Sequence, residues 1–248
     1  MIVSDRLGSL RLLKIDRPEK RNALTPGLIQ ALRDGIRAAA ADPEVSGVVI
    51  AGEGPAFCSG VDLGEFATGD RRSVRALIEL LAELCGAARR SPKPVAAAVQ
   101  GACIGGAFEL ALACDFRVAS PDARFGLPEV LIGIPSVIDA ALLERYVGLG
   151  RAREMILTGR LIDAGQAHEW GIVNRLAEPD ALVAAAGELI ALVNRATPEA
   201  IRVQKALFEE WLNLPFQRAV ESSKEALAET FEGGEPQRIA RERLGGKQ

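Results

Sequence analysis

The chain has 248 residues, of which 48% are hydrophobic and 25% charged, so it is long enough to bury a substantial core. Its formal net charge of −3 provides no basic excess for nucleic acid, and aromatic residues make up only 4% of it. No apolar run reaches the roughly 20 residues that a membrane-spanning helix needs. These properties predict a globular protein that binds neither nucleic acid nor membrane.

The cysteine and histidine content narrows the possible chemistry. The four cysteines form no CxxC pair and follow no secretory leader, so we expect free thiols in a cytoplasmic protein. His168 is the only histidine, which leaves too little material for a Cys/His zinc site or a Ser-His-Asp triad. We therefore expect no metal or cofactor, and a structural role for His168.

The first 119 residues alternate between strand and helix patterns. Buried strands are predicted by apolar runs rich in β-branched or small residues, and helices by apolar residues at helical spacing. The predicted order is strands at 2–3 and 10–15, a helix at 26–41, a strand at 47–51, a helix at 73–89, a strand within 91–101, a helix around Glu109 and a strand at 116–119. This alternation predicts an α/β fold in which helices cover sheets.

Helices dominate after residue 151, where only the segment 171–177 has a strand pattern. Helices are predicted at 152–157, 164–170, 180–194 and 198–230. Trp211 and Phe216 of the last helix fit either a core or a subunit interface. The charged tail at 235–248 is expected to fray.

Two glutamates occupy apolar surroundings without a basic neighbour on the same stretch. Glu109 lies in GGAFELALAC and Glu129 in RFGLPEVLIGIP, each after a glycine-bearing turn. A buried, unpaired carboxylate costs several kcal/mol or becomes protonated, so a protein rarely keeps one without a use. The two together predict an acid/base pair.

Glycine-bearing turns predict backbone donors beside these carboxylates. Gly105 and Gly106 open the helix of Glu109, where the first N–H groups have no partner within the helix and the dipole favours an anion. The loop AFCSGVDL carries Gly60 and Val61 after another strand and can supply a second donor. Two converging amides would form an oxyanion hole.

The sequence resembles the crotonase (enoyl-CoA hydratase/isomerase) superfamily over nearly its whole length. The matching blocks, in the order and spacing of that family, are RPEKRNAL, AFCSGVDLGEF, KPVAAAVQGACIGGAFELALACDFRVAS, ARFGLPEVLIGIP and LTGRLIDAGQAHEWGIVNRL. The resemblance implies a crotonase-like spiral of ββα units over residues 1–190 and a C-terminal helical oligomerisation region over 191–248. It also implies an acyl-CoA thioester substrate and a homotrimer or hexamer.

Position by position, the resemblance assigns the oxyanion-hole amides to Val61 and Gly106 and the two carboxylates of the hydratases to Glu109 and Glu129. Glu109 would be the base that draws a proton from water, and Glu129 the acid that delivers a proton to C2. The other positions expected to contact the substrate are Lys20, Arg21, Ala23, Ser59, Gly60, Asp62, Leu63, Gly105, Pro128, Pro135 and Ser136. Asp62, like Asp115, also fits the bonding of nearby backbone amides.

Both carboxylates are present, which favours an enoyl-CoA hydratase over a Δ3,Δ2-enoyl-CoA isomerase or another crotonase-type acyl-CoA lyase. The third hypothesis is a non-catalytic scaffold that binds CoA thioesters, but a scaffold has no need of two carboxylates whose burial costs free energy. Cys58 and Ser59 have no basic partner and are not expected to be nucleophiles.

Two departures from the family pattern bear on the substrate. Gly64 stands where many hydratases have a lysine that reaches the nucleotide phosphates, so Lys20, Arg21 or a C-terminal basic residue would have to supply ionic contacts to CoA. The segment after Glu129 is one residue shorter than usual and lacks the usual glycines. Because this segment helps to form the acyl pocket, the substrate need be neither short nor linear.

Overall fold

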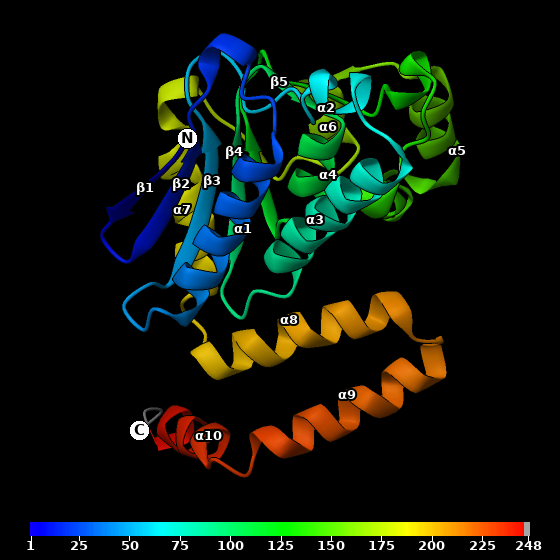
Figure 1. Cartoon of the computed structure of the whole chain (residues 1–248). Helices are drawn as coiled ribbons and strands as arrows, with labels where there is room; N and C mark the ends of the chain where they lie inside the picture. The colour runs from blue at the N-terminus through cyan, green and yellow to red at the C-terminus, as the bar shows by residue number, and fades with distance from the viewer. Residues whose placement is uncertain (246–248) are drawn as a thin grey trace.

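The computed structural model describes residues 1–245, which form two sheets with helices packed against them and three more helices beneath (Figure 1). The larger sheet has the strand order β1-β2-β3-β4-β6-β9 and is parallel except for the β1/β2 pair. Its strands are β1 (Ile2–Leu7), β2 (Leu10–Ile15), β3 (Gly47–Gly52), β4 (Val95–Val99), β6 (Phe116–Ala119) and β9 (Arg175–Leu176). The smaller sheet contains β5 (Ala102–Ile104), β7 (Arg124–Gly126) and β8 (Ile162–Asp163).

Helices connect and cover these strands. The α-helices are α1 (Pro26–Ala41), α2 (Leu63–Ala67), α3 (Arg71–Arg89), α4 (Gly106–Ala113), α5 (Leu143–Thr158), α6 (Ala164–Glu169), α7 (Leu182–Val193), α8 (Pro198–Asn213), α9 (Phe216–Thr230) and α10 (Glu235–Gly245). Short 3-10 helices are η1 (Pro18–Lys20), η2 (Glu129–Ile132), η3 (Ile138–Leu142) and η4 (Pro179–Ala181).

The central strands of the larger sheet are buried on both faces. Val48 and Ile50 pack into the main core with α1, α3 and α4, whereas Val49 and Ala51 point to the other face. The second face is covered by α7 through Ala186 and other apolar residues. Burial on two faces explains why β3 and β4 are continuous runs of small and β-branched residues.

Most of the predicted elements are confirmed. The helix at 26–41 begins where expected because Thr25 caps its N-terminus and Pro26 occupies the first turn. The strands at 10–15 and 116–119 also have the predicted bounds. The strands β5 and β7 and the five-residue helix α2 were not predicted, because three to five residues carry too little periodicity.

Two predictions for the C-terminal part are wrong. The single helix expected at 198–230 is two helices, because Leu214 is extended before Pro215, which disfavours helical backbone at the preceding residue. The tail expected to fray forms α10 from Glu235 to Gly245. The rest of that tail, residues 246–248, lies outside the described residues.

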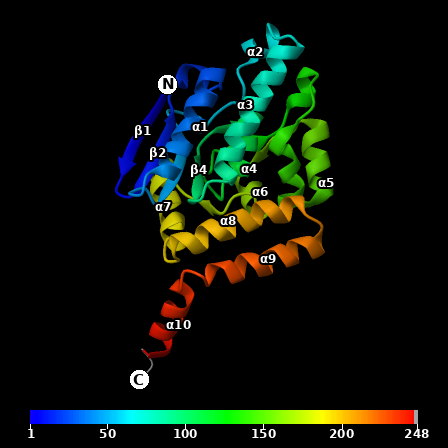
Figure 2. The same cartoon turned by 60° about the horizontal axis from the view of Figure 1, so that its bottom comes forward.

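The last three helices extend beyond the sheets. Figure 2 shows α8 beneath the core, α9 running back alongside it and α10 pointing away from the rest of the chain. Phe216 at the start of α9 is 77% exposed and Trp211 43%, so neither is a core residue of the single chain. The division at residue 190 and the role of these helices in assembly stay predictions.

Candidate active site

Parallel pairing of β5 with β7 brings the two glutamate-bearing segments together. Ile104 pairs with Gly126, and the N–H of Gly105 donates to the carbonyl of Gly126 at 2.9 Å. The helix α4, which carries Glu109, starts immediately after β5, and η2, which starts at Glu129, follows β7 closely. The sheet register thus juxtaposes segments 20 positions apart in sequence.

The loop after β3 meets the start of α4 at the same place. Gly60 has a φ of 94° and Gly105 a φ of 59°, both in the region that favours glycine. A Cβ atom on Gly60 would lie 2.7 Å from the carbonyl oxygen of Ile104, so the two segments touch backbone to backbone. Within residues 1–245, the N–H groups of Val61 and Gly106 donate no hydrogen bond. Two adjacent, unpaired donors fit an oxyanion hole.

Glu109 is buried in this site with one carboxylate oxygen unsatisfied. Its side chain comes from the first turn of α4, the residue is only 2% exposed, and Oε2 has no hydrogen-bond partner in the described part of the chain. Burial and the nearby charge of Glu129 raise the pKa of Glu109 to about 8, while the backbone N–H of Val137 opposes this rise. At neutral pH, Glu109 therefore holds a proton in the free protein.

Glu129 differs from Glu109 in its surroundings. It is half-buried rather than buried, which corrects the expectation that both carboxylates are buried. The hydroxyl of Ser136 donates to Oε2 of Glu129 at 2.7 Å, and Oε1 faces Gly105. The two glutamates thus differ in burial and in hydrogen bonding.

These groups line a cavity of about 510 Å³. Its lining includes both glutamates, Val61, Gly106 and nearly all the predicted substrate-contacting residues, namely Lys20, Arg21, Ala23, Ser59, Gly60, Asp62, Leu63, Gly105, Pro128 and Pro135. Ser136 is absent from the lining and acts on the site through Glu129. The structure thus brings together residues from four separate segments of the chain.

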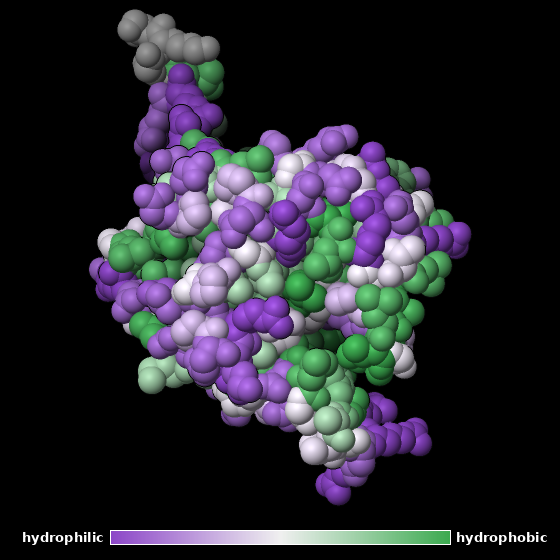
Figure 3. Space-filling model, turned by 90° about the horizontal axis from the view of Figure 1, so that it is seen from above, coloured by the Kyte–Doolittle hydropathy of each residue, from purple (hydrophilic) through white to green (hydrophobic). Residues whose placement is uncertain are grey.

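Apolar side chains complete the cavity, and the sequence did not single them out. They are Phe66, Ile78, Leu81, Ile104, Leu131, Ile132, Ile134, Val137 and Ile138. Figure 3 shows hydrophobic surface gathered around a hollow on the face seen from above. The signal available in the sequence was the run of aliphatic residues after Glu129, of which Leu131 is 69% exposed. An apolar wall suits an aliphatic acyl chain.

The charged residues at the site have separate roles. Lys20 and Arg21 are exposed where they border the cavity, so they can reach an anionic group outside it. Asp62 caps α2 by accepting from the N–H of Gly64 at 3.0 Å and pairs with Arg17 at 2.6 Å. These two interactions lower the pKa of Asp62. Asp62 therefore has the backbone-bonding role that its position suggested, in addition to bordering the cavity.

Asp115, His168 and the cysteines have the structural roles that the sequence predicted for them. Asp115 accepts from the N–H of Val95 at 2.7 Å, and His168 bonds the carbonyl of Val173 through Nδ1 at 2.9 Å. All four cysteines are buried free thiols. Burial raises the pKa of Cys58 to about 12, which makes it a poor nucleophile. No helix within residues 1–245 has the length and apolar character to cross a membrane.

The comparisons with known proteins agree with this geometry. The family described as Enoyl-CoA hydratase/isomerase matches residues 5–240. The chain is 39% identical to the mevalonyl-coenzyme A hydratase sidH of Aspergillus fumigatus over 82% of its own length and 75% of the relative's. It is 31% identical to the crotonyl-CoA hydratase of Syntrophomonas wolfei, with 93% and 89% of the two chains covered.

Solved structures of enoyl-CoA hydratases share the fold of this chain. An enoyl-CoA hydratase from Polaromonas sp. JS666 superposes with a TM-score of 0.91 at 30% identity, covering 99% of this chain and 97% of the other. The match confirms the predicted α/β crotonase-like architecture with a helical C-terminal region. Sequence, fold and site together show that the chain belongs to the enoyl-CoA hydratase/isomerase family.

Proposed function

We propose that this chain is an enoyl-CoA hydratase, a hydro-lyase that reversibly adds water across the C2=C3 double bond of an α,β-unsaturated acyl-CoA. The observation that carries the proposal is the meeting of two carboxylates and two unpaired N–H groups in one apolar cavity. The crotonyl-CoA hydratase of Syntrophomonas wolfei and the short-chain-enoyl-CoA hydratase of Clostridium acetobutylicum, at 31% and 32% identity, support the assignment.

The N–H groups of Val61 and Gly106 would stabilise the enolate. Water attack at C3 moves negative charge onto the thioester oxygen, and two donors aimed at that oxygen lower the barrier. One such donor typically contributes about 3 to 4 kcal/mol of transition-state stabilisation. Gly60 and Gly105 leave the approach to these amides free of side chains.

Glu109 and Glu129 would act as one acid/base unit. One carboxylate takes a proton from the attacking water as its oxygen bonds to C3, and the other gives a proton to C2, so the pair keeps one proton overall. In the free protein this proton resides on Glu109, whose pKa is about 8. The proposed roles, Glu109 as base and Glu129 as acid, therefore require the proton to move to Glu129 once water and substrate are bound. Because the groups are coupled, the pH–rate profile reports the pair.

The CoA part and the acyl part would bind at different regions of the cavity. The exposed Lys20 and Arg21 would meet phosphate groups at the rim, in place of the lysine that Gly64 replaces. The apolar residues after Glu129 would surround the acyl group. The mevalonyl-coenzyme A hydratase among the relatives supports a branched acyl group in this cavity. Crotonyl-CoA, whose acyl group is linear, would not test this possibility.

We further propose that the protein works in the cytoplasm as a homotrimer or hexamer and needs no cofactor besides the CoA of its substrate. The free thiols within the described chain support a reducing environment. The exposed Phe216 and Trp211 support burial of α8 and α9 between subunits.

A panel of enoyl-CoA thioesters, including crotonyl-CoA and branched members, tests the proposed reaction in water enriched in oxygen-18. Loss of the conjugated absorbance and a 3-hydroxyacyl-CoA that carries one labelled oxygen are expected. Migration of the double bond without incorporation of label would instead assign the isomerase activity. Binding of the thioesters with no product would leave only the scaffold function.

A further inference from the structure

The segment 135–139 lies beside both glutamates, because Pro135, Val137 and Ile138 line the same cavity. The hydroxyl of Ser136 donates to Glu129 at 2.7 Å, and the backbone N–H of Val137 acts on the carboxylate of Glu109. The two donors are consecutive in sequence, so a shift of this short segment would disturb both glutamates together. The position of this segment therefore bears on both carboxylates.

This segment has a backbone conformation that needs support. Ile138 has a φ of 48°, in the left-handed region that β-branched side chains very rarely adopt. Such a residue stays in place only where surrounding interactions hold it. The next residue, Asp139, is 4% exposed at its side chain and forms an ion pair with Arg89 at the end of α3.

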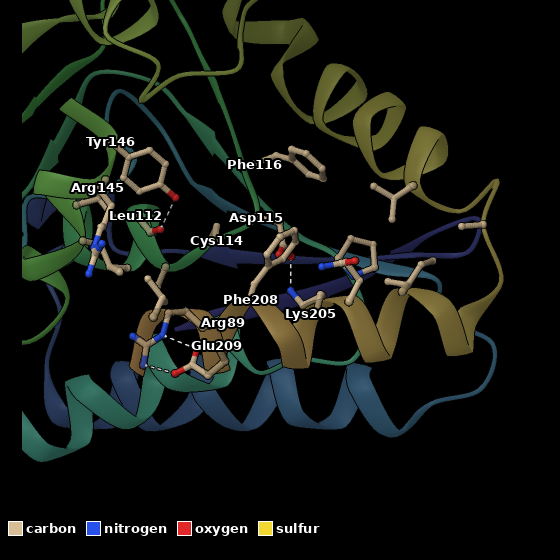
Figure 4. Close-up of a pocket in the computed structure, with 18 of the residues that line it drawn as sticks. Arg89, Leu112, Cys114, Asp115, Phe116, Arg145, Tyr146, Lys205, Phe208 and Glu209 are labelled. Carbon is tan, nitrogen blue, oxygen red and sulfur yellow. Dashed lines mark hydrogen bonds and ion pairs between the residues drawn. The ribbon is translucent and has the colours of Figure 1, made fainter. Parts of the chain in front are cut away.

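Arg89 is itself held from a second side. Its Nε and Nη2 donate to the carboxylate of Glu209 in α8 at 3.0 and 3.3 Å, as Figure 4 shows. The guanidinium therefore lies between a carboxylate of the C-terminal helix and the buried carboxylate of the catalytic segment. A planar group fixed by two acids defines a position better than a single flexible ion pair does.

We infer that Asp139 and Arg89 are positioning residues for the catalytic pair: their ion pair holds segment 135–139 so that Ser136 and Val137 address Glu129 and Glu109. Neither residue borders the cavity that holds the glutamates. The expected effect on kcat rests on the proposed hydratase function. The positioning of segment 135–139 does not depend on that function. Arg89 also links α8 to the active site through Glu209.

Asp139→Asn tests the inference with little change of shape, because Asn retains the size of Asp and removes only the charge. We expect kcat for hydration to fall by roughly 10- to 100-fold, as for a misplacement of about 1 Å, with KM little changed. Loss of the Val137 N–H from Glu109 disfavours the charged form, so the limb of the pH–rate profile that reports the pair should move to higher pH. Asp139→Glu, which keeps the charge, should recover part of kcat.

Asp115→Asn is the matched control. Asp115 forms an ion pair with Lys205 of α8, near Arg89 and Glu209 (Figure 4). Its hydrogen bonds and ion pairs within residues 1–245 do not involve segment 135–139. This variant should lower thermal stability while kcat and the pH profile stay close to those of the wild type. Equal kinetic losses in both variants, or wild-type kinetics in Asp139→Asn, would overturn the positioning role.

A second measurement separates failure of this inference from failure of the proposed function. The pKa of Glu109, followed by carbon NMR of its side-chain carboxyl in the wild type and in Asp139→Asn, requires no turnover. Glu129 of η2, whose charge raises the pKa of Glu109, and the thiol of Cys85 of α3, whose own pKa Glu109 raises, are unchanged by the substitution. A higher pKa in the variant supports the inference even if no enoyl-CoA is hydrated. An unchanged pKa contradicts it even if hydration is observed.

Discussion

Gly105 leaves the space that Oε1 of Glu129 needs: a Cβ atom on Gly105 would lie 2.7 Å from that oxygen. The same glycine has a φ of 59° and caps the helix of Glu109. One residue without a side chain thus permits the close approach of the two segments and begins the helix whose first N–H, that of Gly106, donates no hydrogen bond within residues 1–245. The relationship explains why a helix N-terminus and a second carboxylate share one cavity.

Gly105→Ala should remove most of the activity. The added methyl group would collide with Glu129 and would also occupy a strained backbone conformation, which we expect to lower kcat by about 100-fold or more and stability by about 1 kcal/mol. Steady-state kinetics and urea unfolding measure the two effects. Gly8→Ala is the control, because Gly8 has a similar φ of 63° and nothing within 4 Å of the added Cβ. If Gly8→Ala lost as much activity, displacement of Glu129 would not be the cause.

Glu109→Gln and Glu129→Gln should each lower kcat severely, by about 100- to 10,000-fold, because neither amide exchanges a proton with water or C2. The double variant should be little worse than either single one, since the two groups act as a unit. Affinity for a saturated acyl-CoA, measured by calorimetry, should persist. Near-normal turnover in either single variant would refute the role of that carboxylate.

The raised pKa of Glu109 predicts a specific dependence of stability on pH. Between its ordinary value of 4.5 and about 8, Glu109 is protonated in the folded chain and ionised in the unfolded chain. The folded state then binds more protons, so this group's contribution to stability falls as pH rises from about 5 to 8, with a slope of at most about 1.4 kcal/mol per pH unit, and levels off above 8. Glu109→Gln has no such titration, so its free energy of unfolding relative to the wild type should increase across this interval. A constant difference in urea unfolding from pH 5 to 9 would mean that the pKa of Glu109 is not raised.

The wild-type protein should sediment as a trimer or hexamer. Phe216→Asp should shift it towards smaller species, because it would place a charge where we propose that α9 is buried between subunits. Analytical ultracentrifugation measures both. Leu7→Asp, at an exposed position of β1, should sediment like the wild type, because β1 lies away from α9 in Figure 1. A wild-type monomer would contradict the proposed assembly.

Removal of metal ions should leave hydration unchanged, because the proposed steps need only carboxylates and backbone N–H groups. Dialysis against EDTA, followed by assay with the best thioester of the panel, tests this. Loss of turnover that is restored by one divalent cation would show that the site is incomplete as proposed.

Local patterns in the sequence were enough to locate most elements and both glutamates. Thr25 and Pro26 set the start of α1, and the apolar runs of β3 and β4 could be read as doubly buried strands. The break before Pro215 could have been predicted, because a proline disfavours helical backbone at the residue before it. The helical spacing of apolar residues on both sides of Pro215 instead suggested one continuous helix. The three-residue strands β5 and β7 could not be predicted, since they are strands only because they pair with each other in the folded chain.

The sequence by itself determined which groups are available: two carboxylates without basic neighbours, two glycine-bearing loops and an aliphatic segment after Glu129. Only the tertiary structure decided how they differ. Desolvation, which raises the pKa of Glu109, and the hydrogen bond that Ser136 donates to Glu129 depend on what surrounds each group in space. The ion pair between Arg89 and Asp139 joins residues 50 positions apart, and no local pattern marks it. Burial and long-range pairing are properties of the folded chain, so the surroundings that shift the pKa of Glu109 arise only on folding.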